Sequence, residues 1–255
     1  MRIDLPPITP AIMSQLAPHG VIRAALNYGN GVLVQRGDDE QSPRGVSPDL
    51  ARALGEHLNV PVHFTGFPAA GQVFDALDAA PDAPERWDIA FLAIEPKRAE
   101  QIAFTAPYVL IEGTYLVRKD SPIRKAAEMD QPGRRISVGP NSAYHLYLQR
   151  TLQHATLVPA EIGGGRAMIE TFLRENLDAA AGVRQPLAAY AAEDPTVRVL
   201  DDAFMQIRQA MGVPRAHEAG ARYLTAFVEK MKADGLVVNA LIRSGQVAQV
   251  APLTG

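Results

Sequence analysis

Short apolar segments alternate with segments of helical period along the first half of the chain, and this alternation restricts the fold more than any other feature. Residues 21–26, 60–64 and 89–94 have the pattern of buried or half-buried strands. Between them, around residues 47–58 and 73–77, apolar side chains recur every three or four positions. This order predicts a parallel sheet covered by helices on both faces, with ligands bound beyond the carboxyl ends of its strands.

The first of these helices has a strong local start signal. Ser47 supplies a capping hydroxyl, Pro48 a proline in the first turn and Asp49 an acid in the first turn. We therefore predict that the helix begins at Ser47.

The second half of the chain repeats the pattern. Strand-like segments at 136–138, 157–158 and 179–183 enclose helical segments at 143–152 and 167–173. This order predicts a second α/β unit.

Two further strand-like segments look like crossovers between the halves, one from 113 to 118 and the other from 204 to 213. We therefore predict an α/β chain with two lobes joined by extended strands. Residues 1–111 and 208–255 form the first lobe in this prediction, and residues 112–207 form the second.

Composition removes several classes of function. The chain of 255 residues has no cysteine, which excludes disulfides, thiolate catalysis and cysteine metal sites. Its formal net charge is −3 and it has no run of lysine or arginine, so we expect neither nucleic acid nor an anionic membrane surface as a partner. No apolar run reaches membrane-spanning length, which argues against direct insertion into a membrane.

The first twenty residues contain four prolines and lack the basic start and continuous apolar stretch of a secretory signal. We expect a periplasmic protein if a signal peptide has been removed, and a cytoplasmic protein if the printed sequence is the native one.

The most specific motif lies at residues 88–108. It reads DIAFLAIEPKRAEQIAFTAPY, which is a buried strand, a turn, an arginine, and then an apolar residue followed by Phe, Thr, any residue, Pro and Tyr. Shorter motifs follow the same order along the chain: GVSPDLA at 45–51, VRKDSP at 117–122, VG at 138–139, LDAA at 177–180 and KADG at 232–235. Together these motifs resemble family 3 of the extracellular solute-binding proteins, which are polar amino acid receptors of ABC transporters.

The resemblance implies a periplasmic-binding-protein type 2 fold, in which two α/β lobes joined by two hinge strands close around a ligand in a cleft. It implies a small-molecule ligand that bears a carboxylate, and no cofactor. For a transport role it implies an ABC transporter permease as the partner, while a sensing role stays open as an alternative.

In that family, the arginine that matches Arg98 pairs with the ligand carboxylate. A guanidinium offers a planar fork of donors that matches two carboxylate oxygens, so the chemistry fits. The alternative role for Arg98 is that of a surface arginine at a helix start.

The resemblance places the other contacts of the first lobe on loops that follow the strands. They are Asn27, Tyr28, Asn30, Phe67 and the backbone of Leu92 and Ala93. The family commonly has an aromatic residue where Asn30 stands, so one wall of a stacking pocket is not expected here. It often has serines where Phe91 and Ala93 stand, so this pocket is expected to be more apolar. Phe67 could equally pack in the core, because an aromatic residue there is more often core than ligand wall.

In the second lobe the implied contacts are Ser142, Ala143, Val183 and Arg184. Ser142 could equally be a plain helix N-cap. Arg184 could enter the cleft or pair with Glu161 or Glu193.

Val183 stands where amino-acid-binding relatives have an aspartate that pairs with the ligand ammonium. An apolar side chain cannot compensate the lost hydration of that buried charge. We therefore expect carboxylates without an α-ammonium, such as keto, hydroxy or aromatic acids, to be preferred. The alternative is that Glu95, Glu112 or Glu161 supplies the missing charge from another direction.

Other constellations are weak. The six histidines have no spacing typical of metal ligands, so no metal site is expected. The glycines at 163–165 indicate a flexible loop.

The alternative to a binding function is a dehydratase-like enzyme on the same fold that acts on a cyclic carboxylate. It needs an acid at residues 183–186, where none stands, although Glu95 and Glu112 remain possible acids.

Overall fold

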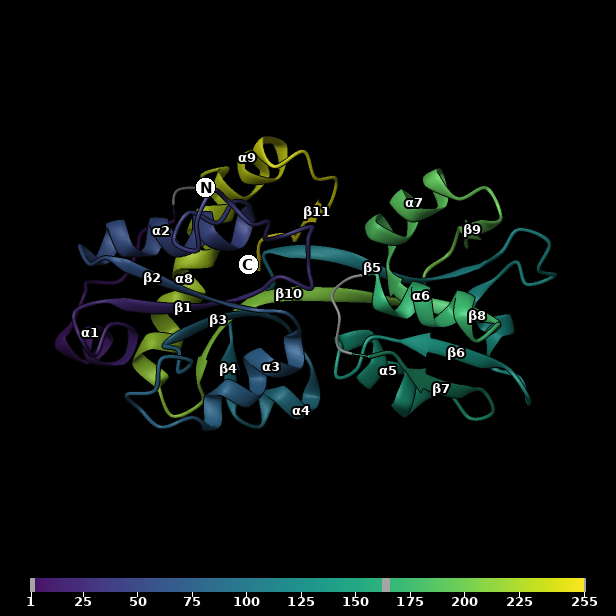
Figure 1. The fold of residues 1–255 in the computed structure, drawn as a ribbon. Helices are drawn as coiled ribbons and strands as arrows, with labels where there is room; N and C mark the ends of the chain where they lie inside the picture. The colour runs from purple at the N-terminus through teal and green to yellow at the C-terminus, as the bar shows by residue number, and fades with distance from the viewer. Residues whose placement is uncertain (1–2, 162–165, 255) are drawn as a thin grey trace. The chain divides into compact units, whose positions relative to one another are not determined.

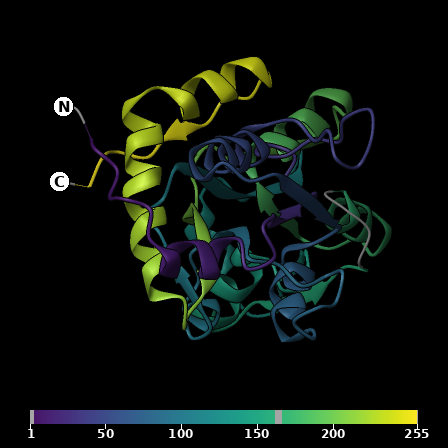
Figure 2. The ribbon, with the colours of Figure 1, turned by 90° about the vertical axis from the view of Figure 1, so that its left-hand side faces the viewer.

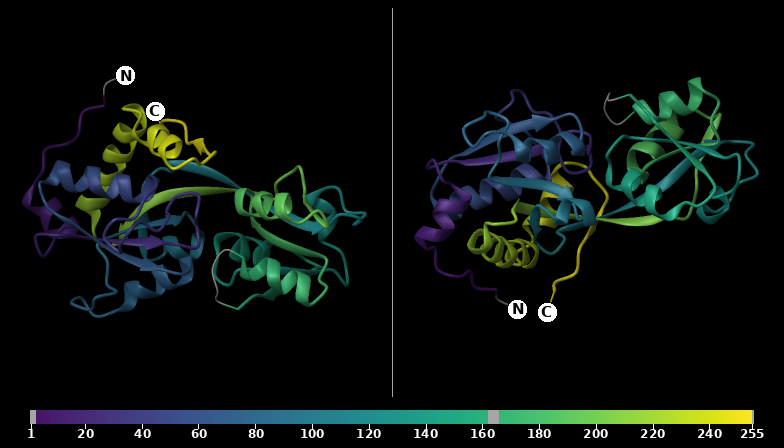
Figure 3. Two further views of the ribbon diagram at one scale, coloured as in Figure 1. Left: turned by 45° about the horizontal axis from the view of Figure 1, so that its top comes forward. Right: turned by 90° about the horizontal axis from the view of Figure 1, so that it is seen from below.

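The computed structural model describes residues 3–161 and 166–254, so the glycine loop predicted at 163–165 lies outside the described residues. The chain divides into two compact units (Figure 1). Unit 1 contains Met1–Leu110 and Arg208–Gly255, and unit 2 contains Ile111–Ile207. The chain passes between them within two long strands, β5 (Val109–Arg118) and β10 (Met205–Pro214) (Figure 3).

The sheet of unit 1 is built on three parallel strands, β1 (Ile22–Asn27), β2 (Val62–Phe67) and β3 (Ile89–Ala93). Their order is β2-β1-β3-β10, and β10 runs antiparallel to β3. Every residue of β3 is buried, as expected for a parallel strand covered on both faces. Two short strands complete the sheet: β4 (Ile102–Phe104) pairs with β10, and β11 (Gln249–Val250) pairs with the start of β5.

Helices cover both faces of this sheet. Those of unit 1 are α1 (Pro10–Leu16), α2 (Val46–Leu58), α3 (Ala70–Asp75), α4 (Pro96–Ala99), α8 (Glu218–Ala233) and α9 (Leu236–Arg243), and a 3-10 turn (Ala76–Asp78) follows α3. Figure 1 shows α2 and α3 on opposite sides of β1. Helix α8 contacts both α1 and α9, and Figure 2 shows these two helices beside it.

The start of α2 differs from the prediction. The helix begins at Val46 and its N-cap is Gly45, which makes no side-chain capping bond. Ser47 is buried, and its hydroxyl lies 3.1 Å from the hydroxyl of Tyr108. Because Ser47 is used in this long-range contact, its side chain does not cap the helix, and the observed N-cap, Gly45, lies two residues before the predicted one.

Trp87 belongs to an apolar cluster that includes residues of β1, β3 and α3. Its indole Nε1 donates to the carbonyl of Val73 at 2.8 Å, so the one polar atom of this buried side chain is satisfied. The cluster also includes Leu77, Leu92 and Ile102, with Phe67 packed at its edge. This cluster fixes α3 against the sheet.

Unit 2 is the second α/β unit that the sequence predicts. Its strands besides β5 are β6 (Arg135–Val138), β7 (Thr156–Pro159), β8 (Ala179–Val183) and β9 (Val197–Val199). Its order is β5-β8-β6-β7; β6 is parallel to β7 and β8, and β5 is antiparallel to β8 and β9. Its helices are α5 (Ala143–Thr151), α6 (Ala167–Arg174) and α7 (Arg184–Glu193), with a 3-10 turn at Ala126–Met129.

Candidate ligand-binding site

The carboxyl ends of the parallel strands bring several predicted residues of unit 1 to one edge. Asn27, the last residue of β1, lies opposite Phe67, the last residue of β2. The next residue, Tyr28, donates its N–H to the carbonyl of Phe67 at 2.9 Å. Because β3 is parallel to β1, its end at Ala93 lies at the same edge. We call this set of strand ends the carboxyl edge of unit 1.

A tight turn follows β1 at this edge. The side-chain Oδ1 of Asn27 accepts the N–H of Gly29 at 3.0 Å, and the carbonyl of Asn27 accepts the N–H of Asn30 at 3.0 Å. The side-chain Oδ1 of Asn30 is buried and accepts no hydrogen bond from the residues that the structure describes. A buried acceptor of this kind can take a hydrogen bond from a ligand hydroxyl or N–H.

Tyr28 packs within unit 1. The guanidinium carbon of Arg36 lies 4.4 Å from the ring centroid, a cation–π distance. The ring also covers Gly66, where an added Cβ would lie 2.2 Å from Tyr28 Cε2. Burial raises the pKa of Tyr28, so its hydroxyl stays protonated at neutral pH. These contacts hold the ring against β2.

Phe67 takes the core role that the sequence left open. Its side chain is half-buried and packs against the Trp87 cluster. The ring therefore supports the carboxyl edge through packing.

The backbone at the end of β3 is bonded to β10. The N–H of Ile94 donates to the carbonyl of Arg208 at 2.8 Å. Since residues of an antiparallel pair alternate between bonded and non-bonded positions, Leu92, two residues before Ile94, is in a bonded pair with Ala210. The N–H of Leu92 is thus used within the sheet.

Arg98 lies immediately beyond β3, in the short helix α4. Pro96 opens this helix, and the carboxylate of Glu95 caps it by accepting the N–H of Lys97 at 2.8 Å. Arg98 is only 2 % exposed, and its Nη1 donates to the carbonyl of Ala93 at 3.3 Å. The alternative of a surface arginine is therefore wrong.

Burial lowers the pKa of Arg98 to about 10, and the nearby carboxylates of Glu95 and Asp75 act in the opposite direction. The guanidinium therefore stays charged at neutral pH. Glu95 is itself 2 % exposed, so Arg98 places a buried positive charge beside a buried acid. Sequence reasoning considered Glu95 as an enzymatic acid or as a counter-charge for a ligand ammonium, and missed its place beside Arg98. Its position three residues before Arg98 was the available signal for this pairing of charges.

The corresponding edge of unit 2 is formed by the turn between β6 and α5. Asn141 has a positive φ of 55°, and Ser142 caps α5 by accepting the N–H of His145 at 3.1 Å. Ser142 therefore has the capping role that the sequence left open, and Ala143 is the buried first residue of the helix. A Cβ on Gly139 would lie 2.6 Å from the hydroxyl of Tyr144, so the turn is closely packed.

His145 holds this turn in place, and sequence reasoning missed it. Its Nδ1 accepts the backbone N–H of Asn141 at 2.9 Å, which requires a ring unprotonated at Nδ1. Burial lowers the pKa of His145, which favours this neutral form. The one-turn spacing from Asn141 to His145 was the only sequence signal for the contact.

We predict that acid weakens the turn. A histidine with a lowered folded pKa contributes its full stability above its ordinary pKa of about 6.5 and loses it as the pH falls from there through the lowered value. Hydrogen exchange at the Asn141 amide should therefore accelerate as the pH falls through this window, after correction for the intrinsic exchange rate. In His145→Gln, whose side-chain oxygen accepts without titrating, this acceleration should disappear; its persistence would contradict the prediction.

At the end of β8, helix α7 begins without a loop, because Val183 is its N-cap and Arg184 its first residue. The Nε of Arg184 donates to Glu112 at 2.5 Å, and its Nη1 and Nη2 each donate at 2.9 Å to the carbonyls of Leu200 and Asp201. The predicted pairing of Arg184 with Glu161 or Glu193 is therefore wrong. Glu193 instead pairs with Arg166 at 2.8 Å.

Among the described residues there is no group of three or more His, Asp or Glu side chains that could hold a metal ion. In the same described part of the chain, no helix combines the length and apolar character needed to cross a membrane.

Comparison with known proteins gives a family and a fold. The family model described as bacterial extracellular solute-binding proteins, family 3, matches residues 33–241. No curated protein sequence matches the chain. Many solved structures do match it.

Three of these structures illustrate the kinds of protein that match. An ancestral amino acid-binding protein, a precursor of cyclohexadienyl dehydratase, is 21 % identical with a TM-score of 0.71, over 91 % of this chain and 98 % of that one. A protein assigned as the binding component of an ABC transporter from Wolinella succinogenes, solved with lysine, is 18 % identical with a TM-score of 0.71, over 88 % and 95 %. A histidine kinase sensor domain with similarity to periplasmic binding proteins is 17 % identical with a TM-score of 0.72, over 91 % and 98 %. At sequence identities this low, the structural similarity shows a shared fold and nothing further. It confirms the predicted periplasmic-binding-protein architecture.

Proposed function

We propose that this chain, which belongs to family 3 of the bacterial extracellular solute-binding proteins, captures a small carboxylate-bearing solute for ABC-type uptake or for sensing. The observation that carries the proposal is the family match over residues 33–241. Binding of a solute follows from the family, and the carboxylate is the part that we infer from the site.

Arg98 is the group that we assign to the carboxylate. It is charged at neutral pH and lies directly after β3, at the carboxyl edge of unit 1. Hydrogen bonds between a guanidinium and a carboxylate are stronger in a buried, low-dielectric setting than in water. The buried Oδ1 of Asn30, in the turn that follows β1, adds a hydrogen-bond acceptor. An acid that also carries a hydroxyl would suit this combination.

Among the described residues at the end of β8, unit 2 presents no carboxylate that could pair with a ligand ammonium. Val183 ends the strand with an apolar side chain, and Arg184 is bound to Glu112 and to two backbone carbonyls. An ammonium buried against Val183 would lose its hydration without gaining a counter-charge there. We therefore propose that the solute is a keto, hydroxy or aromatic acid without an α-ammonium.

A thermal-shift screen that pairs each amino acid with its keto and hydroxy analogues tests this ligand class. At an analogue concentration of about 100 Kd, binding should stabilise the protein by about 2.7 kcal/mol and raise Tm by about 5 °C or more. The matching amino acid should give a smaller shift, because its ammonium is desolvated without a partner. Stabilisation by several amino acids, with none by their analogues, would overturn the assignment.

We propose binding without chemistry. Glu112 is engaged with Arg184, and Glu95 caps α4 beside Arg98, so both acids already have structural partners. Acids that bind in the screen should be recovered unchanged after incubation with the protein. Product formation that disappears in Glu95→Gln or Glu112→Gln would instead establish an enzyme.

A further inference from the structure

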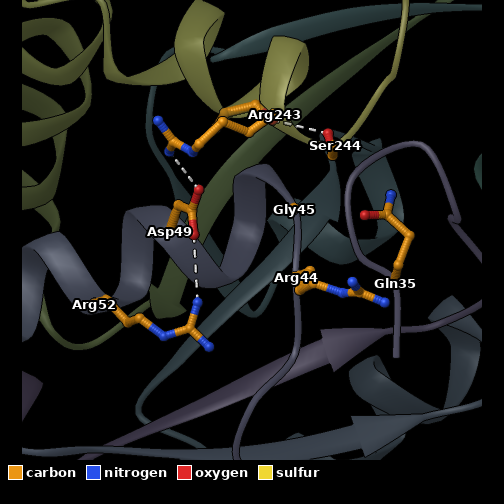
Figure 4. Close-up of a pocket in the computed structure, with 8 residues that line it drawn as sticks. Gln35, Arg44, Gly45, Asp49, Arg52, Arg243 and Ser244 are labelled. Atoms are coloured by element: carbon orange, nitrogen blue, oxygen red, sulfur yellow. Dashed lines mark hydrogen bonds and ion pairs between the residues drawn. The ribbon is translucent and has the colours of Figure 1, made fainter. Parts of the chain in front are cut away.

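A pocket lies in unit 1, and none of the predicted ligand contacts lines it. Its volume is about 400 Å³, within the range of small-molecule sites. It lies between the start of α2 and the end of α9 (Figure 4). The residues that line it are Gln35, Arg44, Gly45, Asp49, Arg52, Ala240, Arg243 and Ser244.

Three arginines and one acid face this pocket. Figure 4 shows Asp49 between Arg52 and Arg243, with the side chain of Arg44 extending toward Gln35. The Nη2 of Arg44 donates to the carbonyl of Arg36 at 3.4 Å. The three cations and the single carboxylate leave a local charge of +2, whereas the whole chain has a formal net charge of −3. A pocket with this charge favours anionic ligands.

The cations of the pocket are held in place by contacts within unit 1. Arg52 donates to the carbonyl of Pro43 at 2.7 Å, lies 3.3 Å from Asp49, and stacks over Phe64 at 5.1 Å. Arg243 lies 2.7 Å from the other carboxylate oxygen of Asp49. Because these contacts already order the side chains, a bound anion would lose less affinity to side-chain ordering.

The backbone of Arg44 is fixed as well. Its N–H and carbonyl exchange hydrogen bonds of 2.9 and 2.8 Å with Gln35 in an isolated β-bridge. This bridge holds Arg44 and Gln35 as neighbours at the rim of the pocket.

The turn before α2 fixes the backbone between Arg44 and the helix. Its N-cap, Gly45, has a φ of 114°, and a Cβ there would lie 2.5 Å from the carbonyl oxygen of Leu33, so the turn requires glycine. The N–H of Ser47 donates to the carbonyl of Leu33 at 3.1 Å, Pro48 has no N–H, and the N–H of Asp49 donates to the carbonyl of Gly45 at 3.1 Å. The arginine side chains are therefore the groups that could bind an anion here.

We propose that this pocket binds a multivalent oxyanion, either a polyphosphate or a polycarboxylate. Guanidinium groups match both kinds of oxyanion with paired hydrogen bonds. The ligand needs several negative charges because its attraction to the arginines must exceed its repulsion by the carboxylate of Asp49, and because it must pair with more than one arginine. This site is separate from the proposed solute site, and either one can exist without the other.

Isothermal titration of the full chain with pyrophosphate and with citrate, at constant ionic strength near neutral pH, tests the proposal. At least one of the two should bind saturably, and the one that binds identifies the class. Arg243→Gln and Arg44→Gln should each weaken that binding about tenfold or more, because each removes charge-assisted bonds. Amide shifts on binding should concentrate at residues 44–49 and 243–245.

Arg222→Gln is the matched control. Arg222 is 74 % exposed on α8 and does not line the pocket, yet its replacement removes the same charge. It should leave the binding unchanged within about twofold. The proposal is overturned if neither anion saturates the wild-type protein, or if Arg222→Gln weakens binding as much as Arg243→Gln does.

Discussion

Replacing Lys232 with methionine should lower the free energy of unfolding of unit 1 by about 3–5 kcal/mol. The Nζ of Lys232 lies 2.6 Å from Glu229, and the two side chains are 1 % and 9 % exposed. Lys232 also donates to the carbonyls of Pro107 and Pro252, at 3.2 and 2.9 Å. Methionine has a similar length, but it leaves the carboxylate of Glu229 buried without its cation.

Urea unfolding followed by the fluorescence of Trp87 measures this effect. Trp87 is the only tryptophan in the sequence and is buried in unit 1. Lys230→Met is the matched control, because Lys230 pairs with Asp234 at 2.7 Å on the same helix but the two side chains are 25 % and 48 % exposed. That variant should lose about 1 kcal/mol or less. An equal loss of unfolding free energy in the two variants would show that the buried pair contributes no more to stability than the exposed pair.

Replacing Arg98 with alanine should weaken binding of the tightest acid from the analogue screen by about 30- to 1,000-fold, which is about 2–4 kcal/mol. The substitution removes the buried cation at the carboxyl edge of unit 1 and its bond to Ala93. Calorimetric titration measures the affinity. Circular dichroism establishes that the variant is folded at the temperature of the titration.

Two further variants separate the role of Arg98 from general electrostatics. Lys97→Ala removes the neighbouring exposed cation of α4 and should leave the affinity almost unchanged. Arg98→Lys keeps the charge but loses the planar fork of donors, so its affinity should lie between those of wild type and Arg98→Ala. A folded Arg98→Ala protein with wild-type affinity would place the carboxylate elsewhere.

Much of the fold could be predicted because its strands are short apolar runs. Strand β8 was predicted at 179–183 and is observed as Ala179–Val183, and β3 differs from its predicted range by one residue. Such strands are buried on both faces, so the apolar pattern depends little on context.

Helices without a clear apolar period were missed. In α7 only Leu187 is buried and Pro186 stands in the first turn, so the segment lacks a clear apolar period.

For the candidate site, the sequence predicted where the residues lie in the fold better than it predicted which partners their side chains contact. The motif around Arg98 located an arginine after a buried strand, but its burial beside Glu95 depends on how α4 folds back toward the end of β3. For Arg184 the sequence left open a place in the cleft or a pairing with Glu161 or Glu193, yet its partner Glu112 is 72 residues away in the sequence. Long-range pairs of this kind leave no periodic signal, and a single sequence therefore cannot reveal them.

The claim that the solute is held through a carboxylate is tested most directly by titrating the protein with an acid from the screen and with the primary amide of the same acid. The amide has nearly the same shape but no charge, so it cannot form charge-assisted hydrogen bonds with Arg98. We predict saturable binding of the acid and binding of the amide that is about 10- to 100-fold weaker. An amide that binds within about threefold of its acid would contradict the account.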